Sequence, residues 1–374
     1  MPLDAQGEEN ILAALEQRHR IYQIGLFGLT DAVLDRFAAA IEEPLPALTH
    51  FSFYSLDVTP AMLPETFLGG SAPRLLSLAL RGIPFPSLPN FVLSASRLQL
   101  LHLYNIPHSG YIPPQAMVAF LPSLSNLGHL LLEFQDPQSR PIQMIPPPLT
   151  RAVLPALTRF RFSGVSEYLE DFVARIDTPL LNSLRITLFL DSILDIPRFQ
   201  NFIDRAEMLK PLSQAEVILG PRSIQAVLGS LTGRPDALRL EFQRCLGREA
   251  IAQISNQLSS FLSQVEWLSI SEIPQDELGW QDDADRIPWL ELLTPFVSAK
   301  SLRITEELAP RFAAALQERK NERITEVLPA LHDMFLEGLR PSGSLWQAIQ
   351  PFVSARQLSD HPVVVQRWER ILES

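Results

Sequence analysis

The stretch Leu98-Gln99-Leu100-Leu101-His102-Leu103-Tyr104-Asn105-Ile106 decides the fold class of this chain of 374 residues. Its apolar residues Leu98, Leu101, Leu103 and Ile106 are separated by two, one and two other residues. The alternating centre, Leu101-x-Leu103, has the two-residue period of a strand with one buried face. Leu75, Leu78, Leu80 and Ile83 repeat the same spacing upstream. The pattern therefore predicts neighbouring strands that bury equivalent positions.

The same pattern recurs along nearly the whole chain, and its third apolar position serves as a marker. The markers are Leu26, Phe53, Leu80, Leu103, Leu132, Phe162, Ile186, Val217, Leu240, Ile270, Ile304 and Leu336. Successive markers are separated by 23 residues (Leu80 to Leu103) to 34 residues (Ile270 to Ile304). The copies at Val217, Leu240 and Ile304 are weaker. Self-similarity at such a period is typical of a repeat protein.

The segments between the predicted strands have the apolar spacing of helices. Spacings of three and four predict helices over 31–41, 166–176 and 311–320, and Pro197 can open another because a first-turn proline loses no internal hydrogen bond. Alternating strands and helices imply parallel strands with helical crossovers. At this repeat length we expect an α/β leucine-rich-repeat solenoid, a ribonuclease-inhibitor-like horseshoe with parallel strands on the concave face and helices on the convex face.

The repeat divides the chain into three predicted parts. Residues 1–20 should form an N-terminal capping helix, and residues 21–340 a solenoid of about 12 irregular repeats. Residues 341–374 should form a C-terminal helical cap. Within that cap we expect a short helix over 363–372 whose Trp368 covers the last repeat.

Composition excludes several classes of protein. A net charge of −11 argues against nucleic-acid binding, which needs a basic face, and no apolar run approaches the length of a membrane span. A single cysteine, Cys245, argues against a disulfide framework or a cysteine-based metal cluster. The start of the chain lacks a signal-peptide pattern. We therefore expect an intracellular protein, cytoplasmic or nuclear, with no membrane contact.

No residue pattern indicates catalysis, so we expect a protein that is not an enzyme and has no cofactor. The seven histidines form no His-x-x-x-His pair. His102 and His129 face solvent on adjacent predicted strands, but two surface residues are a better interpretation than a metal pair without a carboxylate. Cys245 lacks an identifiable base. Catalytic, cofactor and metal sites are all predicted to be none.

The predicted concave face is the best candidate for a binding site. Positions between the buried apolar residues point to solvent, because side chains alternate along a strand. These positions are rich in the residue types of interface hot spots. The candidate partner-binding residues are Tyr54, Arg81, His102, Tyr104, His129, Arg159, Arg161, Arg185, Trp267 and Arg303. Phe27, His50 and Glu133 occupy equivalent positions. The alternative interpretation is that these side chains simply cover a sheet.

Segments 91–114, 147–155, 166–179 and 351–358 resemble a family of fungal F-box/leucine-rich-repeat-like proteins. The resemblance implies substrate recognition for a cullin–RING (SCF-type) ubiquitin ligase, through an F-box that docks on a Skp-type adaptor. The roughly 20 residues before the first predicted strand leave no room for an F-box. We therefore expect a non-catalytic module that binds an unknown protein partner and does not bind the adaptor. The alternatives are the substrate-recognition part of a ligase whose F-box is missing from this chain, and a leucine-rich-repeat regulator of a GTPase.

Overall fold

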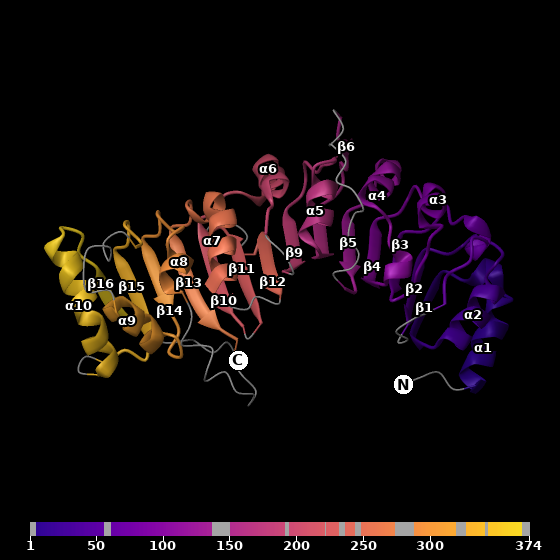
Figure 1. Ribbon diagram of the computed structural model, residues 1–374. Helices are drawn as coiled ribbons and strands as arrows, with labels where there is room; N and C mark the ends of the chain where they lie inside the picture. The colour runs from indigo at the N-terminus through magenta and orange to yellow at the C-terminus, as the bar shows by residue number, and fades with distance from the viewer. Residues whose placement is uncertain are drawn as a thin grey trace. The chain divides into compact units, whose positions relative to one another are not determined.

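The computed structural model describes residues 5–55, 61–136, 150–190, 194–220, 222–231, 236–243, 248–273, 288–318, 327–340 and 343–368 (Figure 1). It has a mixed α/β fold with a large, mostly parallel sheet and helices. The chain forms two compact units. Unit 1 comprises Met1–Phe189 and Ile196–Met208, and unit 2 comprises Leu190–Asp195 and Leu209–Ser374.

Unit 1 contains a run of parallel strands that are neighbours in chain order. They are β1 (Gln23–Leu29), β2 (His50–Ser55), β3 (Ser77–Arg81), β4 (Leu100–Ile106), β5 (His129–Phe134), β7 (Arg159–Gly164) and β9 (Ser183–Phe189). Two short strands, β6 (Ala152–Val153) and β8 (Ile176–Asp177), pair separately. These strands pair in parallel because each connection is long enough to return the chain to the edge of the sheet at which the preceding strand began.

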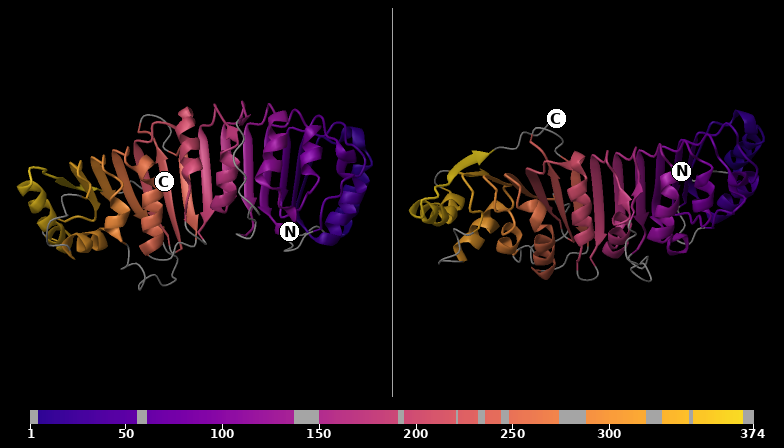
Figure 2. Two further views of the ribbon diagram at one scale, coloured as in Figure 1. Left: turned by 45° about the horizontal axis from the view of Figure 1, so that its top comes forward. Right: turned by 90° about the horizontal axis from the view of Figure 1, so that it is seen from above.

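The helices of unit 1 lie on one face of these strands (Figure 2). They are α1 (Ala5–Leu15), α2 (Asp31–Ala40), α3 (Leu88–Leu93), α4 (Pro114–Phe120), α5 (Ser166–Val173) and α6 (Pro197–Arg205). Short 3-10 turns η1 to η5 occupy Arg18–Arg20, Phe67–Gly70, His108–Gly110, Leu121–Ser123 and Glu207–Leu209. The helices expected after residues 31, 166 and 197 are confirmed, and Pro197 is the first residue of α6. Within the described ranges, no helix covers the other face, which we call the open face.

The core of unit 1 forms because the repeated apolar positions stand in register. Phe51, Leu78, Leu101 and Leu130 are consecutive partners on β2 to β5, and all are buried. The third apolar position forms a second buried row two residues further along each strand. All twelve marker positions of the sequence pattern lie in strands. The pattern thus predicted the strands and their buried face correctly.

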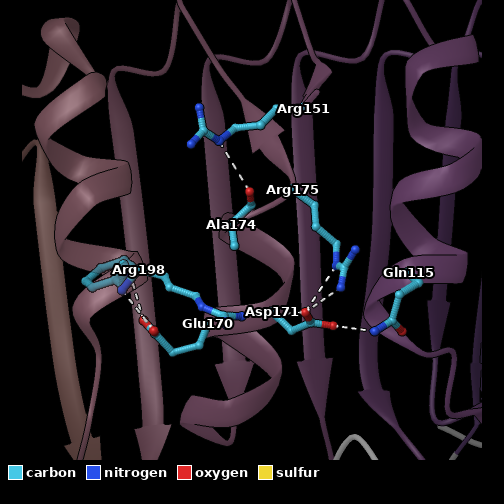
Figure 3. Close-up of polar contacts among 8 residues, drawn as sticks. Gln115, Arg151, Glu170, Asp171, Ala174, Arg175 and Arg198 are labelled. Carbon is cyan, nitrogen blue, oxygen red and sulfur yellow. Dashed lines mark hydrogen bonds and ion pairs between the residues drawn. The ribbon is translucent and has the colours of Figure 1, made fainter. Parts of the chain in front are cut away.

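A buried ionic cluster joins α4, α5 and α6 (Figure 3). Asp171 on α5 is 0% exposed. Its Oδ1 accepts hydrogen bonds from Nε (3.1 Å) and Nη2 (2.8 Å) of Arg175, and its Oδ2 accepts one from Gln115 Nε2 (2.6 Å). The Glu170 carboxylate accepts the backbone N–H groups of Arg198 (2.9 Å) and Phe199 (2.7 Å). Glu170 therefore caps α6, whose first N–H groups have no partner within the helix.

Unit 2 departs from the expected all-parallel arrangement in its first strands. β10 (Gln214–Leu219), β11 (Ser223–Gly229) and β12 (Leu238–Gln243) form an antiparallel meander, with β11 in the middle. The prediction of parallel strands with helical crossovers is wrong here, and β11 was not predicted. The physical reason is connection length, because a few residues can reverse the chain but cannot complete a parallel crossover.

The rest of unit 2 returns to parallel pairing. β10 is followed across the sheet by β13 (Trp267–Glu272), β14 (Ser301–Ile304), β15 (Asp333–Glu337) and β16 (Val364–Trp368). The helices are α7 (Arg248–Leu262), α8 (Trp289–Leu293), α9 (Ala309–Glu318) and α10 (Ser344–Leu358). α9 overlaps the helix expected over 311–320 and begins two residues earlier, and residues 319 and 320 lie outside the described residues.

The expected helix over 363–372 is wrong across residues 364–368, which form the parallel strand β16 beside β15. The preceding helix, α10, carries Arg356, whose side chain is 0% exposed. One of its terminal nitrogens, Nη2, donates to the backbone carbonyls of Leu328 (3.3 Å), Pro329 (3.2 Å) and Leu331 (3.1 Å). Arg356 thus fixes the loop that leads into β15, because buried carbonyls need hydrogen-bond donors.

Candidate binding surface

Eight of the ten predicted binding residues lie on the open face of unit 1. Strand register aligns Tyr54, Arg81 and Tyr104 in one row across β2, β3 and β4. A second row contains His102, Leu131, Arg161 and Arg185, and a third pairs His129 with Arg159. We call this set, together with Phe27, the aromatic–arginine surface. Its residues are Phe27, Tyr54, Arg81, His102, Tyr104, His129, Arg159, Arg161 and Arg185.

The part of this surface on β1 to β4 is aromatic. The Phe27 and Tyr54 rings pack edge to face with centroids 4.8 Å apart, and Tyr54 and Tyr104 do so at 6.0 Å. Because Tyr54 and Tyr104 are two strands apart, their rings approach each other across β3. Phe27 is 57% exposed, which is unusual for a large apolar side chain. This end of the surface is therefore a cluster of aromatic rings in contact with one another, of which Phe27 is exposed and the two tyrosines are half-buried.

Two histidines connect the aromatic part to the arginines. The rings of His102 and His129 stack with centroids 6.4 Å apart, and the Tyr104 hydroxyl lies 3.4 Å from Nδ1 of His102. Burial lowers the pKa of His102, and the nearby His129 and Arg161 lower it further. Burial and then Arg159 lower the pKa of His129. Both shifts favour the neutral imidazole at pH 7.

Arginines dominate the part of the surface on β7 and β9. Arg159, Arg161 and Arg185 are exposed, and Arg161 Nη2 lies 3.7 Å from the Glu133 carboxylate on β5. Between His102 and Arg161 in the same row lies Leu131, which is only 6% exposed although it faces outward. Its low exposure indicates that neighbouring long side chains cover Leu131 with their apolar stems.

Acidification below pH 6.5 should destabilise unit 1 through the two histidines. Their pKa values are lowered from the ordinary 6.5, so the unfolded chain binds more protons as the pH falls through that value. The stability difference between pH 7.5 and pH 5.5 should therefore be smaller in the double variant His102→Gln/His129→Gln than in the wild type. Urea unfolding at the two pH values measures it, with His108→Gln, at an exposed position in η3, as the control. Equal pH dependence in wild type and double variant would contradict this expectation.

The remaining two predicted residues, Trp267 and Arg303, lie in unit 2. Trp267 stacks on Phe335 with ring centroids 5.5 Å apart. The guanidinium carbon of Arg303 lies 3.0 Å from the ring centroid of Trp368, a cation–π contact. Trp368 therefore covers Arg303 from a strand and not from the expected helix. Phe335 was missed, although it stands between the buried Met334 and Leu336, where the same alternation rule would have selected it.

The described residues show neither a metal-binding cluster nor a membrane-spanning helix. Within them, no group of three or more His, Cys, Asp or Glu side chains is arranged to hold a metal ion. None of the helices in those ranges combines the length and apolar character that crossing a bilayer requires. Cys245 lies outside the described residues. No protein-family model matches the chain, and no curated protein matches it.

Proposed function

We propose that this chain is a leucine-rich-repeat protein without catalytic activity, and that it binds a protein partner through the aromatic–arginine surface of unit 1. The observation that carries the proposal is that aromatic rings in mutual contact and exposed arginines lie together on one sheet face. Tyrosine and arginine are enriched at the centres of protein interfaces, where they contribute much of the binding energy.

The packing of the surface supports binding over simple coverage of the sheet. Ring contacts join Phe27, Tyr54 and Tyr104, and His102 joins Tyr104 to His129. Side chains already held in one arrangement lose less conformational entropy when a partner binds. The repeated strand and helix units of the chain support the solenoid part of the proposal, because repeat proteins present extended sheet faces of this kind.

Substituting Tyr54 and Tyr104 with alanine should weaken the binding of the protein partner. Affinity purification with the full chain as bait, followed by mass spectrometry, identifies proteins bound by the wild type. In the variant Tyr54→Ala/Tyr104→Ala, binding of the direct partner should weaken by about 2 kcal/mol or more, a factor of about 30 in Kd. Tyr22→Ala is the matched control, because Tyr22 is exposed but precedes β1 and lies outside the surface. A partner that binds wild type and double variant equally would refute the use of this surface.

The ligase and GTPase alternatives remain predictions that direct measurements address. A Skp-type adaptor should not bind the purified chain, and candidate GTPases should hydrolyse GTP at the same rate with and without it.

A further inference from the structure

We propose that the aromatic–arginine surface recognises an acidic segment of its protein partner, in which an aromatic or large aliphatic residue is followed by carboxylates. This inference rests on the proposed function and adds the chemistry of the partner. The apolar residue would contact Tyr54 and Tyr104, and the carboxylates would pair with Arg161 and Arg185.

The outward face of the unit 1 strands is positively charged. The outward positions of β1 to β5, β7 and β9 carry four arginines and one acidic residue, Glu133, and no lysine or aspartate. With histidines counted as neutral in both cases, this face has a formal charge of +3 in a chain whose net charge is −11. A positive face on an otherwise acidic protein is electrostatically complementary to an acidic ligand. The arginines are Arg81, Arg159, Arg161 and Arg185.

The type of cation on this face also favours carboxylates as ligands. Every cation on this face is an arginine, whose planar guanidinium can donate two parallel hydrogen bonds to one carboxylate. Arg161 already lies 3.7 Å from the Glu133 carboxylate, so a carboxylate fits beside it. A protein segment is favoured over a nucleic acid because a long polyanion would extend beyond this small face and meet the acidic remainder of the chain.

Strand spacing predicts where the carboxylates lie in the segment. Neighbouring strands are about 4.8 Å apart, so β7 is about 10 Å and β9 about 14 Å from β4, which carries Tyr104. An extended peptide advances about 3.4 Å per residue. A segment lying across the strands would therefore cover the distance from its apolar anchor to Arg161 and Arg185 in about three to four residues.

Selection of peptides tests this inference even while the natural partner is unidentified. A random dodecapeptide display library is selected on the full chain, and the consensus peptide is synthesised in acidic form and with Asp and Glu changed to Asn and Gln. Fluorescence anisotropy then measures Kd for the wild type, Arg161→Glu/Arg185→Glu and Tyr54→Ala/Tyr104→Ala. Arg74→Glu/Arg97→Glu is the matched control, because both arginines are exposed in loops that precede strands. A single-stranded 15-mer of DNA or RNA is the competitor.

We expect a consensus with an aromatic or aliphatic anchor and carboxylates three to four residues away. Replacing Asp and Glu of the peptide with Asn and Gln should raise Kd at least about tenfold, the change that loss of one charge-assisted hydrogen bond produces. The protein variant Arg161→Glu/Arg185→Glu should raise Kd by a similar factor. The loop control should leave Kd unchanged, and the oligonucleotide should not compete.

Four results would overturn the inference. Neutral peptides that depend on Tyr54 and Tyr104 but not on Arg161 and Arg185 would do so while leaving the proposed function standing. Peptides that bind every variant equally would refute both proposals. An oligonucleotide that binds more tightly than the peptide would identify a nucleic-acid surface, and a selection without any consensus would show that the face does not read short segments.

Discussion

Replacing Leu101 with aspartate should abolish the cooperative unfolding transition of unit 1. Leu101 is 0% exposed and stands in register between Leu78 on β3 and Leu130 on β5. Its substitution removes a buried leucine and places a carboxylate among apolar side chains, where neither water nor a cation can stabilise the charge. We expect a loss of more than about 5 kcal/mol, beyond the range of ordinary single substitutions. Differential scanning calorimetry of the full chain measures it.

The control for this prediction is Leu93→Asp, at an exposed position at the end of α3. It introduces the same charge and removes the same side chain, so it should change stability by about 0.5 kcal/mol or less. Repeated strands rely on their neighbours for burial, so the defect at Leu101 should spread beyond β4. A Leu101→Asp protein with an unchanged melting transition would disprove the assignment of this position to the core.

Asp171→Asn should have the second largest effect, a loss of about 3 to 5 kcal/mol from unit 1. The substitution preserves the shape of the side chain but removes the negative charge that faces Arg175. The Asp171 carboxylate also lies 3.8 Å from Nη1 of Arg198. Removing one member of a buried ion pair leaves the remaining charge less well compensated in a medium of low polarity. Urea denaturation followed by circular dichroism measures the loss.

Asp35→Asn is the matched control for the buried carboxylate. Asp35 lies on helix α2 and is exposed, so the same chemical change should cost about 0.5 kcal/mol or less. If Asp171→Asn were no more destabilising than this control, the cluster in Figure 3 would contribute little to the packing of α4, α5 and α6.

The sequence predicts which side chains of the unit 1 strands face outward, because alternation along a strand places every second side chain on the same face. That rule selected Tyr54, Tyr104 and Arg161 correctly. It could not show that the rings of Tyr54 and Tyr104 meet across β3, since that contact depends on side-chain conformations in three strands. The contact between Arg303 and Trp368 could not be predicted from the sequence either, because the register of β16 brings together residues 65 positions apart in the chain.

The two wrong assignments have different causes. β11 lacks the repeated pattern of four spaced apolar positions. Only its pairing between β10 and β12 reveals it as part of an antiparallel meander. For β16, a local signal existed, because Val363, Val364 and Val365 are β-branched residues that favour strands. These residues favour the strand β16 over the helix expected there.

The sequence by itself determined the twelve strands that carry the repeated pattern, their buried face and the residues that point to solvent, because these depend on a local two-residue period repeated many times. Only the tertiary structure decided the direction of β11, the identity of the last strand, and the buried roles of Asp171 and Arg356. These features depend on partners that are distant in the chain. A charged residue gives no local sign that it will be buried, since its burial is stable only when folding supplies its partners.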